Sequence, residues 1–145
     1  MGLDTAGEPL GRLLARTMKV HRGYVHASLE RLGLYRGQAF ILQVLWLEEG
    51  LPQAELAVRT WVQPATMTTA LQRMEQSGLI VRRPDPEDQR VSRVFLTEAG
   101  RALESPVRES FEEIEKKTFE GFSHAEKALL RQFLESIINN LAQGI

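Results

Sequence analysis

The 145-residue chain has no cysteine and no long apolar run. Without cysteine there is no disulfide framework, no thiolate metal ligand and no thiol redox sensor. No apolar stretch approaches the ~20 residues that a membrane-spanning helix needs. Residues 1–5 do not form the basic region followed by an apolar segment that marks a secretion signal. We therefore expect a cytoplasmic protein without membrane contact.

The chain is also poor in residues that bind metals or carry out catalysis. It has three histidines, and the five-residue spacing of His21 and His26 places them on different faces of a helix. Because no cysteine can complete a ligand set with them or with His124, we expect no zinc site. The sequence shows neither a nucleophile–base pair nor a glycine-rich phosphate loop. It therefore predicts no metal, no cofactor and no enzymatic activity.

Charge is balanced over the whole chain but not along it. The net charge is −1, yet residues 59–83 hold four arginines and one acid, whereas residues 102–145 hold eight acids and five bases. A basic middle beside an acidic C-terminal part indicates that only one part of the molecule faces phosphate. On charge alone, a solvated basic surface explains the arginines equally well.

Apolar residues at spacings of three and four predict four helices in the first half of the chain. A long amphipathic helix is expected over 8–32, followed over 35–49 by a helix that is apolar on nearly every side and hence buried. Two shorter helices are expected over 53–60 and 64–77. Proline suits the first position of the second helix, because its missing N–H is not needed there.

The pattern then changes to alternation, which predicts two strands over 79–83 and 91–96. Between them, a polar segment with two prolines is expected to form a hairpin loop. Thr97 is a suitable N-cap for a helix over 98–120, and we expect Pro106 to bend that helix.

A last helix is predicted after Ser123, which opens a capping-box sequence. Its apolar residues form a stripe too broad for one neighbouring helix: Leu130, Phe133, Leu134, Ile137, Ile138 and Leu141. A monomer of this size would leave that stripe in water. The stripe therefore favours a homodimer held together by the terminal helices.

Two short helices followed at once by a charged hairpin are the arrangement of a winged helix-turn-helix. The major groove of duplex DNA admits one α-helix, which must project from the body with a second helix crossing behind it. Its outward side chains must be small or hydrogen-bonding, and a basic hairpin beside it can reach phosphates or the minor groove. The outward residues of the 64–77 helix that meet this demand are Ala65, Thr66, Thr69, Gln72 and Arg73.

The segment 88–100 resembles the wing signature of the MarR family, D-x-R-x-x-x-V-x-L-T-x-x-G, and segments 53–57 and 71–80 resemble the family's helix-turn-helix. The resemblance implies a mainly α-helical fold with a small two-stranded wing. It implies a transcription regulator, expected to be a repressor, that binds a palindromic operator in double-stranded DNA as a homodimer. A small aromatic or lipophilic anion is the expected effector that releases it.

The resemblance also divides the chain. The winged helix-turn-helix would span 35–97, and the dimerisation region would combine 1–34 with 98–145. Within the wing, the resemblance gives Arg90 the role of entering the minor groove, with Arg93 as a second DNA contact, while Asp88 pairs with a neighbouring arginine to orient the wing.

Simpler roles stand beside these for each residue. Arg90 and Arg93 are also explained as solvated hairpin charges, Asp88 as a residue that only stops the turn, and Arg73 as a partner of Gln76. Thr66 and Thr69 are of a type common on any exposed helix face. If Arg73 does meet DNA, both a phosphate and a base remain open as its partner.

An effector pocket is expected where the dimer helices join the winged domain, because a small shift there is magnified at the DNA. The candidates for its lining are His21 and Tyr24 on the first helix and Trp46 on the second. The alternative is that all three are ordinary core residues.

A third class of function is a helical adaptor that uses the winged fold only for protein contacts. Such an adaptor needs exposed apolar anchors, and the polar face of the 64–77 helix argues against it. Trp61 gives it some support, and it stands where many helix-turn-helix proteins have glycine.

Overall fold

The computed structural model describes residues 6–35 and 37–144. The segment 1–5, considered above as a signal sequence and as the start of the dimerisation region, lies outside it, as do Arg36 and Ile145. The described residues form seven helices and three strands: α1 (Leu10–Glu30), α2 (Gln38–Leu47), β1 (Leu51–Pro52), α3 (Gln53–Thr60), α4 (Pro64–Gln76), β2 (Ile80–Pro84), β3 (Ser92–Leu96), α5 (Glu98–Ala102), α6 (Glu104–Thr118) and α7 (His124–Ala142).

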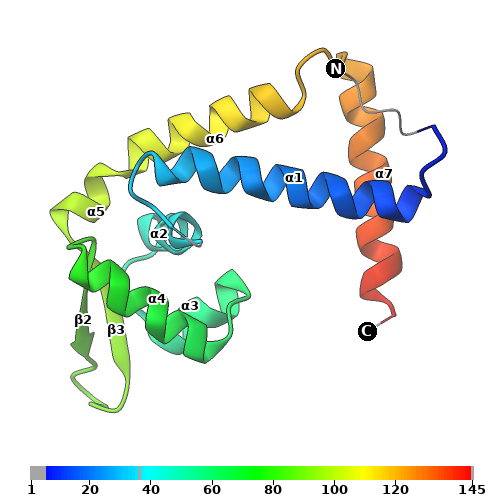
Figure 1. Ribbon diagram of the computed structural model, residues 1–145. Coiled ribbons are helices and arrows are strands. Elements are labelled where there is room, and N and C mark those ends of the chain that lie inside the picture. The colour runs from blue at the N-terminus through cyan, green and yellow to red at the C-terminus, as the bar shows by residue number, and fades with distance from the viewer. Residues whose placement is uncertain (1–5, 36, 145) are drawn as a thin grey trace.

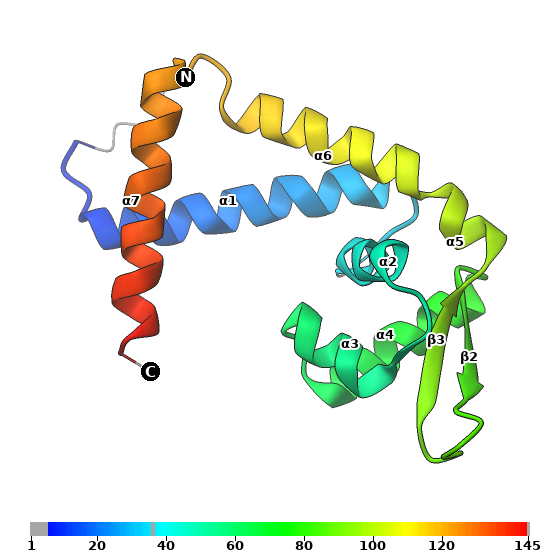
Figure 2. The same ribbon diagram turned by 180° about the vertical axis from the view of Figure 1, so that it is seen from behind.

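Two parts are visible in Figures 1 and 2. The long helices α1 and α6 run together, with α7 beyond them, and a lobe of α2, α3, α4 and the small sheet hangs from one end. The mainly α-helical winged helix-turn-helix fold predicted from the sequence is confirmed. No helix among the described residues is both long and apolar enough to cross a membrane.

The lobe is organised around the buried helix α2. Ile41, Leu42 and Leu45 of this helix are at most 2% exposed, as expected for a helix that is apolar on nearly every side. Full burial of one such side chain stabilises the fold by roughly 1.5–3 kcal/mol. Because α2 contacts α3, α6 and the sheet, it joins the long helices to the winged part.

The sheet has one strand more than the sequence predicted. Strand β3 pairs with β2 to form the expected hairpin and, on its other side, with the two-residue strand β1, in the order β1-β3-β2. Leu51 lies opposite Val94 in this added pair. A strand of two residues carries no alternating pattern, which is why the sequence did not reveal it.

The helix predicted over 98–120 is two helices. Thr97 caps α5 as expected, with its side chain accepting from the N–H of Gly100. The chain then breaks at Leu103, one turn before the expected bend. Pro106 cannot donate a hydrogen bond to the carbonyl of Ala102, so α5 ends there and Pro106 falls in the first turn of α6, where its N–H is not needed.

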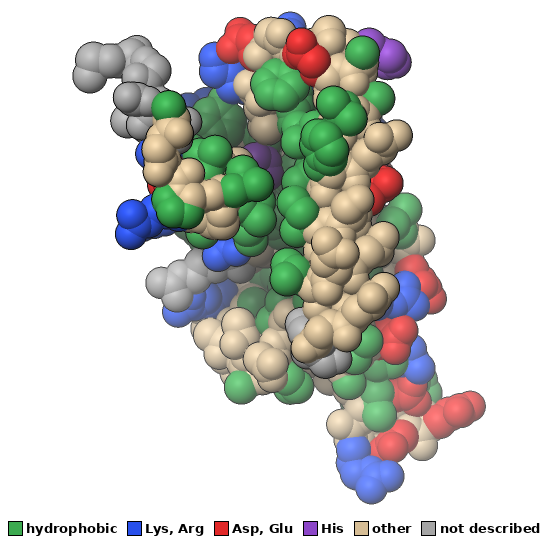
Figure 3. All heavy atoms as spheres, turned by 90° about the vertical axis from the view of Figure 1, so that its right-hand side faces the viewer, with side chains coloured by type: hydrophobic (Ala, Val, Ile, Leu, Met, Phe, Trp, Pro, Cys, Tyr) green, Lys and Arg blue, Asp and Glu red, His purple; other side chains and the backbone are tan. Residues whose placement is uncertain are grey.

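Helix α7 starts at the predicted capping box, since Ser123 and Glu126 each accept a hydrogen bond from the other's backbone N–H. It has no buried residue in the single chain. In Figure 3, hydrophobic side chains gather along one side of this helix. The start of α1 is similarly uncovered, with Leu10 79% exposed.

Gly100 is the position where the packing leaves least room. A Cβ atom there would lie 2.2 Å from the carbonyl oxygen of Leu79. We expect Gly100→Ala to lower the free energy of unfolding by about 1–3 kcal/mol, because the backbone of α5 or of the 78–79 turn must move. Urea denaturation measures this.

The control is Gly23→Ala in α1, where nothing lies within 4 Å of the added methyl group. That change should instead raise stability by about 0.5–1 kcal/mol. Equal effects of the two substitutions would refute the close contact at Gly100.

Candidate nucleic-acid interface

Helix α4 has one fully buried face and one open face. Met67, Leu71 and Met74 are buried in the lobe with no exposed surface. The predicted DNA-reading residues all lie on the exposed side: Ala65, Thr66, Thr69, Gln72 and Arg73. The structure thus places these side chains on one accessible surface, and their contact with DNA stays a prediction.

Helix α3 packs against α4. Leu56 and Ala57 are buried, and the Gln53 side chain donates a 2.7 Å hydrogen bond to the hydroxyl of Thr68 in α4. In the turn between the two helices, Trp61 has a φ of 59°, in the left-handed region that favours glycine. This explains why glycine is frequent at that position, and the Trp61 side chain itself is 95% exposed.

The wing consists of β2, β3 and the loop 85–91 between them. Its first strand is tied to the end of α4 by Glu75, which accepts hydrogen bonds from the backbone N–H and the guanidinium of Arg82. The side-chain bond from Arg82, followed by the backbone bond, holds the pKa of Glu75 below its ordinary value. This pair keeps the wing and α4 in one fixed relation.

The base of the loop is fixed by Arg93. Its Nε donates to Asp85 and its Nη1 donates to the carbonyl of Gly50, at 2.8 Å. Asp85 also accepts from the backbone N–H groups of Glu87 and Asp88, and these bonds, led by the one from Arg93, lower its pKa. The predicted DNA contact at Arg93 remains untested, but its guanidinium already ties the wing to Gly50, the residue before β1.

The tip of the wing presents Arg90, whose side chain is 91% exposed. Its Nε and Nη2 lie 3.0 and 3.2 Å from the two carboxylate oxygens of Asp88. Asp88 also accepts from the Arg90 backbone N–H, and the side-chain bond followed by this one lowers its pKa. The paired guanidinium keeps three of its five N–H bonds for another partner. Arg90 is thus the neighbouring arginine that Asp88 contacts.

The sequence did not single out the residues that position these arginines. Glu75 stood on the polar side of a helix, and Asp85 was one of several polar residues in a loop. The one signal in the sequence for Asp85 is its place between two prolines, which marks it as a residue of the turn. Their partners are seven and eight residues away, so only the folded hairpin shows the pairing.

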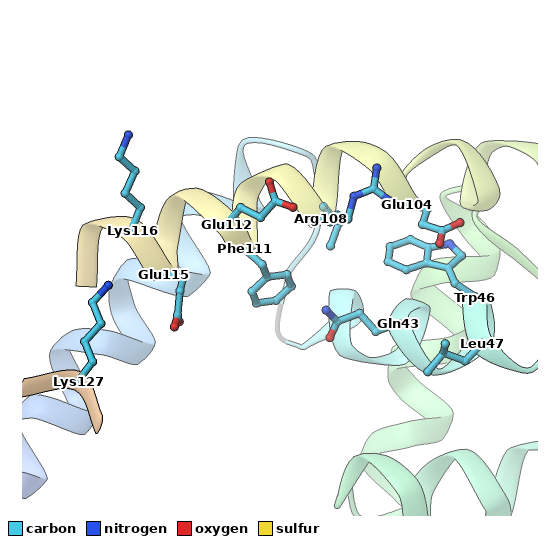
Figure 4. A pocket seen from close by; sticks show the side chains of 11 residues that line it. Gln43, Trp46, Leu47, Glu104, Arg108, Phe111, Glu112, Glu115, Lys116 and Lys127 are labelled. Atoms are coloured by element: carbon cyan, nitrogen blue, oxygen red, sulfur yellow. The ribbon is translucent and has the colours of Figure 1, made fainter. Parts of the chain in front are cut away.

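A cavity of about 830 Å³ lies between α2, α6 and the start of α7 (Figure 4). Trp46, Leu47 and Phe111 form its apolar wall. Its charged lining combines three glutamates with three cationic side chains: Glu104, Glu112, Glu115, Arg108, Lys116 and, at the α7 end, Lys127. His21 and Tyr24 are not among its lining residues, so the structure does not bring the three predicted pocket residues together. Trp46 is held in place by a 2.9 Å hydrogen bond from its indole N–H to the carbonyl of Gly100.

Known proteins share both the sequence pattern and this fold. A family profile described as "MarR family" matches residues 34–92. The HTH-type transcriptional repressor Rv2887 of Mycobacterium tuberculosis is 39% identical over 95 residues, which are 66% of this chain and 68% of that protein. The chain belongs to the MarR family. It is therefore related to transcriptional regulators and not to enzymes.

Two further comparisons support the assignment. The regulator TtmR of Methylorubrum extorquens is 42% identical over 70 residues, which are 48% of this chain but only 36% of TtmR. Bordetella bronchiseptica BpsR, solved in a study of how 6-hydroxynicotinic acid regulates its DNA binding, superposes with a TM-score of 0.77 at 25% identity. That match covers 94% of this chain and 96% of the BpsR chain.

We expect Arg90→Ala to weaken binding to every duplex, whatever its sequence, because a wing arginine meets phosphates and the minor groove. The slope of log K against log salt should become shallower by about 0.9 for one lost phosphate contact. Fluorescence anisotropy between 50 and 200 mM salt measures both quantities.

The matched control is Arg108→Ala, since Arg108 is an exposed arginine on α6, away from the wing. Wild-type binding by the Arg90 variant would show that the MarR family role of this residue does not apply here.

Proposed function

We propose that this MarR-family protein is a transcriptional repressor that binds a palindromic duplex operator as a homodimer. The observation that carries the proposal is the exposed face of α4, made of small and hydrogen-bonding side chains, beside a wing that presents Arg90. A fully buried opposite face and the Glu75–Arg82 pair hold this surface rigid. Relatives named as repressors support the sign of regulation. The relatives TtmR and Rv2887 come from bacteria, which have no nucleus, and this supports placing the protein in the cytoplasm.

The proposed dimer uses the helices outside the winged lobe, residues 6–34 and 98–144 of the described chain. Helix α7 leaves Phe133 56%, Ile138 63% and Leu141 64% exposed. An apolar surface of this extent along a whole helix is uncommon on a monomer. A second copy carries the same surface, and a two-fold axis would let the two cover each other.

Selection of bound sequences from random duplex DNA tests the function directly. We expect an inverted repeat whose half-sites lie about one helical turn, ~10 base pairs, apart, because the dimer axis relates the two α4 helices. Light scattering at micromolar concentration should give the mass of two chains. A folded monomer, or an asymmetric site filled by one chain, would contradict the proposal.

We further propose that the cavity beside Trp46 binds an aromatic or lipophilic anion that releases the DNA. The apolar wall of Trp46, Leu47 and Phe111 suits an aromatic ring. Lys127 supplies a positive charge for the carboxylate of a ligand, although three glutamates also line the cavity. The regulation of DNA binding by 6-hydroxynicotinic acid in BpsR supports an effector of this class. Of the three pocket residues named from the sequence, this proposal keeps Trp46 and leaves out His21 and Tyr24.

Titration of 6-hydroxynicotinate and salicylate into the protein–DNA complex tests the effector proposal. A hundredfold loss of affinity requires the ligand to favour the released state by about 2.7 kcal/mol, since each tenfold is about 1.4 kcal/mol. Lys127→Gln and Trp46→Phe should each raise the concentration needed for release, while His21→Ala should leave it unchanged. Equal release in all four proteins would place the effector elsewhere.

A further inference from the structure

We propose that the groove between the α1–α2 connection and α4 holds the phosphates of one DNA strand, with Tyr35 and Arg73 as its two contacting side chains. The inference rests on the proposed DNA binding and deepens it. It adds Tyr35 to the interface and assigns Arg73 to the backbone and not to a base. The exposed face of α4 is thereby divided into two functions.

The groove encloses about 460 Å³ and follows one flank of α4. Tyr35 and Gln38 line one side, and Thr66, Thr69 and Arg73 line the other. From Thr66 to Arg73 the helix advances about 10 Å, or two turns. That length suits successive phosphates along a strand. The walls carry hydroxyl, amide and guanidinium groups and no carboxylate.

Arg73 differs from the nearby arginines in the partners of its guanidinium group. Arg59, Arg82, Arg90 and Arg93 each form an ion pair with a carboxylate, and the Arg83 guanidinium lies 5.2 Å from the centre of the Phe95 ring. Within residues 6–35 and 37–144, the Arg73 side chain has no hydrogen-bond or ion-pair partner, and it is exposed. An unpaired guanidinium beside a groove without acids attracts an anion, and phosphate oxygens match its geometry.

Contacts of Tyr35 and of the residue before it with the lobe set the position of Tyr35. Leu34 is 2% exposed, and the backbone N–H of Tyr35 donates to the side-chain oxygen of Gln38, which is itself 7% exposed. The Tyr35 side chain is 53% exposed, and its hydroxyl has no partner within the described ranges. A phenol held at a rigid position can donate to a phosphate oxygen without adding charge.

The position of the groove favours phosphates over bases. Base edges lie at the floor of the major groove and are reached by the side chains that project furthest from an inserted helix. A groove walled by a second element lies to the side of that helix, where the sugar–phosphate strand borders the major groove. Arg73 and Tyr35 then fix the position of the protein on the duplex, while Ala65 and Gln72 remain for the bases.

Two substitutions, measured on the selected duplex and on a scrambled duplex of equal length, test the inference. Arg73→Gln should weaken binding to both equally and make the salt slope shallower by about 0.9. Tyr35→Phe should weaken binding to both by roughly fivefold with no change in slope, because a neutral hydroxyl releases no counterion. Gln72→Ala should instead alter the preferred sequence.

The controls are Arg108→Gln on α6 and Tyr24→Phe on α1, which remove the same groups elsewhere, and circular dichroism checks that each variant folds. If Arg73→Gln changes base preference and leaves the slope as it was, or if Tyr35→Phe behaves like Tyr24→Phe, the inference is wrong. A wild-type protein that binds neither duplex overturns the proposed function and this inference with it.

Discussion

The open face of α4 depends on the complete burial of its other face. Met67, Leu71 and Met74 have no exposed surface, and α4 packs against α3 and β2 within the core of the lobe. A helix anchored by three full side chains cannot rotate without exposing them to water, at roughly 1.5–3 kcal/mol for each. The direction in which Thr69 and Gln72 point is therefore set by the core.

The wing is held by a different kind of interaction, because its loop has little apolar surface to bury. Asp85 and Asp88 stabilise the loop instead, because they accept hydrogen bonds from Arg93, Arg90 and nearby backbone N–H groups. Both carboxylates have lowered pKa values for this reason. A carboxyl whose folded pKa is depressed adds stability above its unfolded pKa, about 3.9, and loses it as the pH falls through the folded value. Both carboxyl groups are therefore ionised at neutral pH, where they can accept these hydrogen bonds.

Local signals were sufficient for much of the fold and for the exposed face of α4. The spacing of Met67 and Leu71, the cap at Thr97 and the capping box at Ser123 all act within a few residues, so the sequence shows them directly. Contacts between distant segments were not accessible in this way. Strand β1 exists only because Leu51 meets Val94, and the pocket gathers Trp46 with Phe111 and not with His21. The helix breaks at Leu103, about one turn before the bend predicted at Pro106. The reason is that Pro106 has no N–H to donate to the carbonyl of Ala102, four residues earlier.

One chain of contacts links the cavity to α4, whose exposed face is the proposed DNA-binding surface. Trp46, in the cavity wall, donates to the carbonyl of Gly100 in α5. The start of α5 is in turn hydrogen-bonded to the turn after α4, since the Thr97 N–H donates to the carbonyl of Leu79 and its hydroxyl donates to that of Gly78. Gly100 fits directly against Leu79, with no room between them for a side chain. A ligand that displaces the Trp46 ring would therefore shift α5, α4 and the wing as one body. Because ion pairs and core packing keep that body rigid, such a shift would alter the distance between the two α4 helices of a dimer without changing the shape of either.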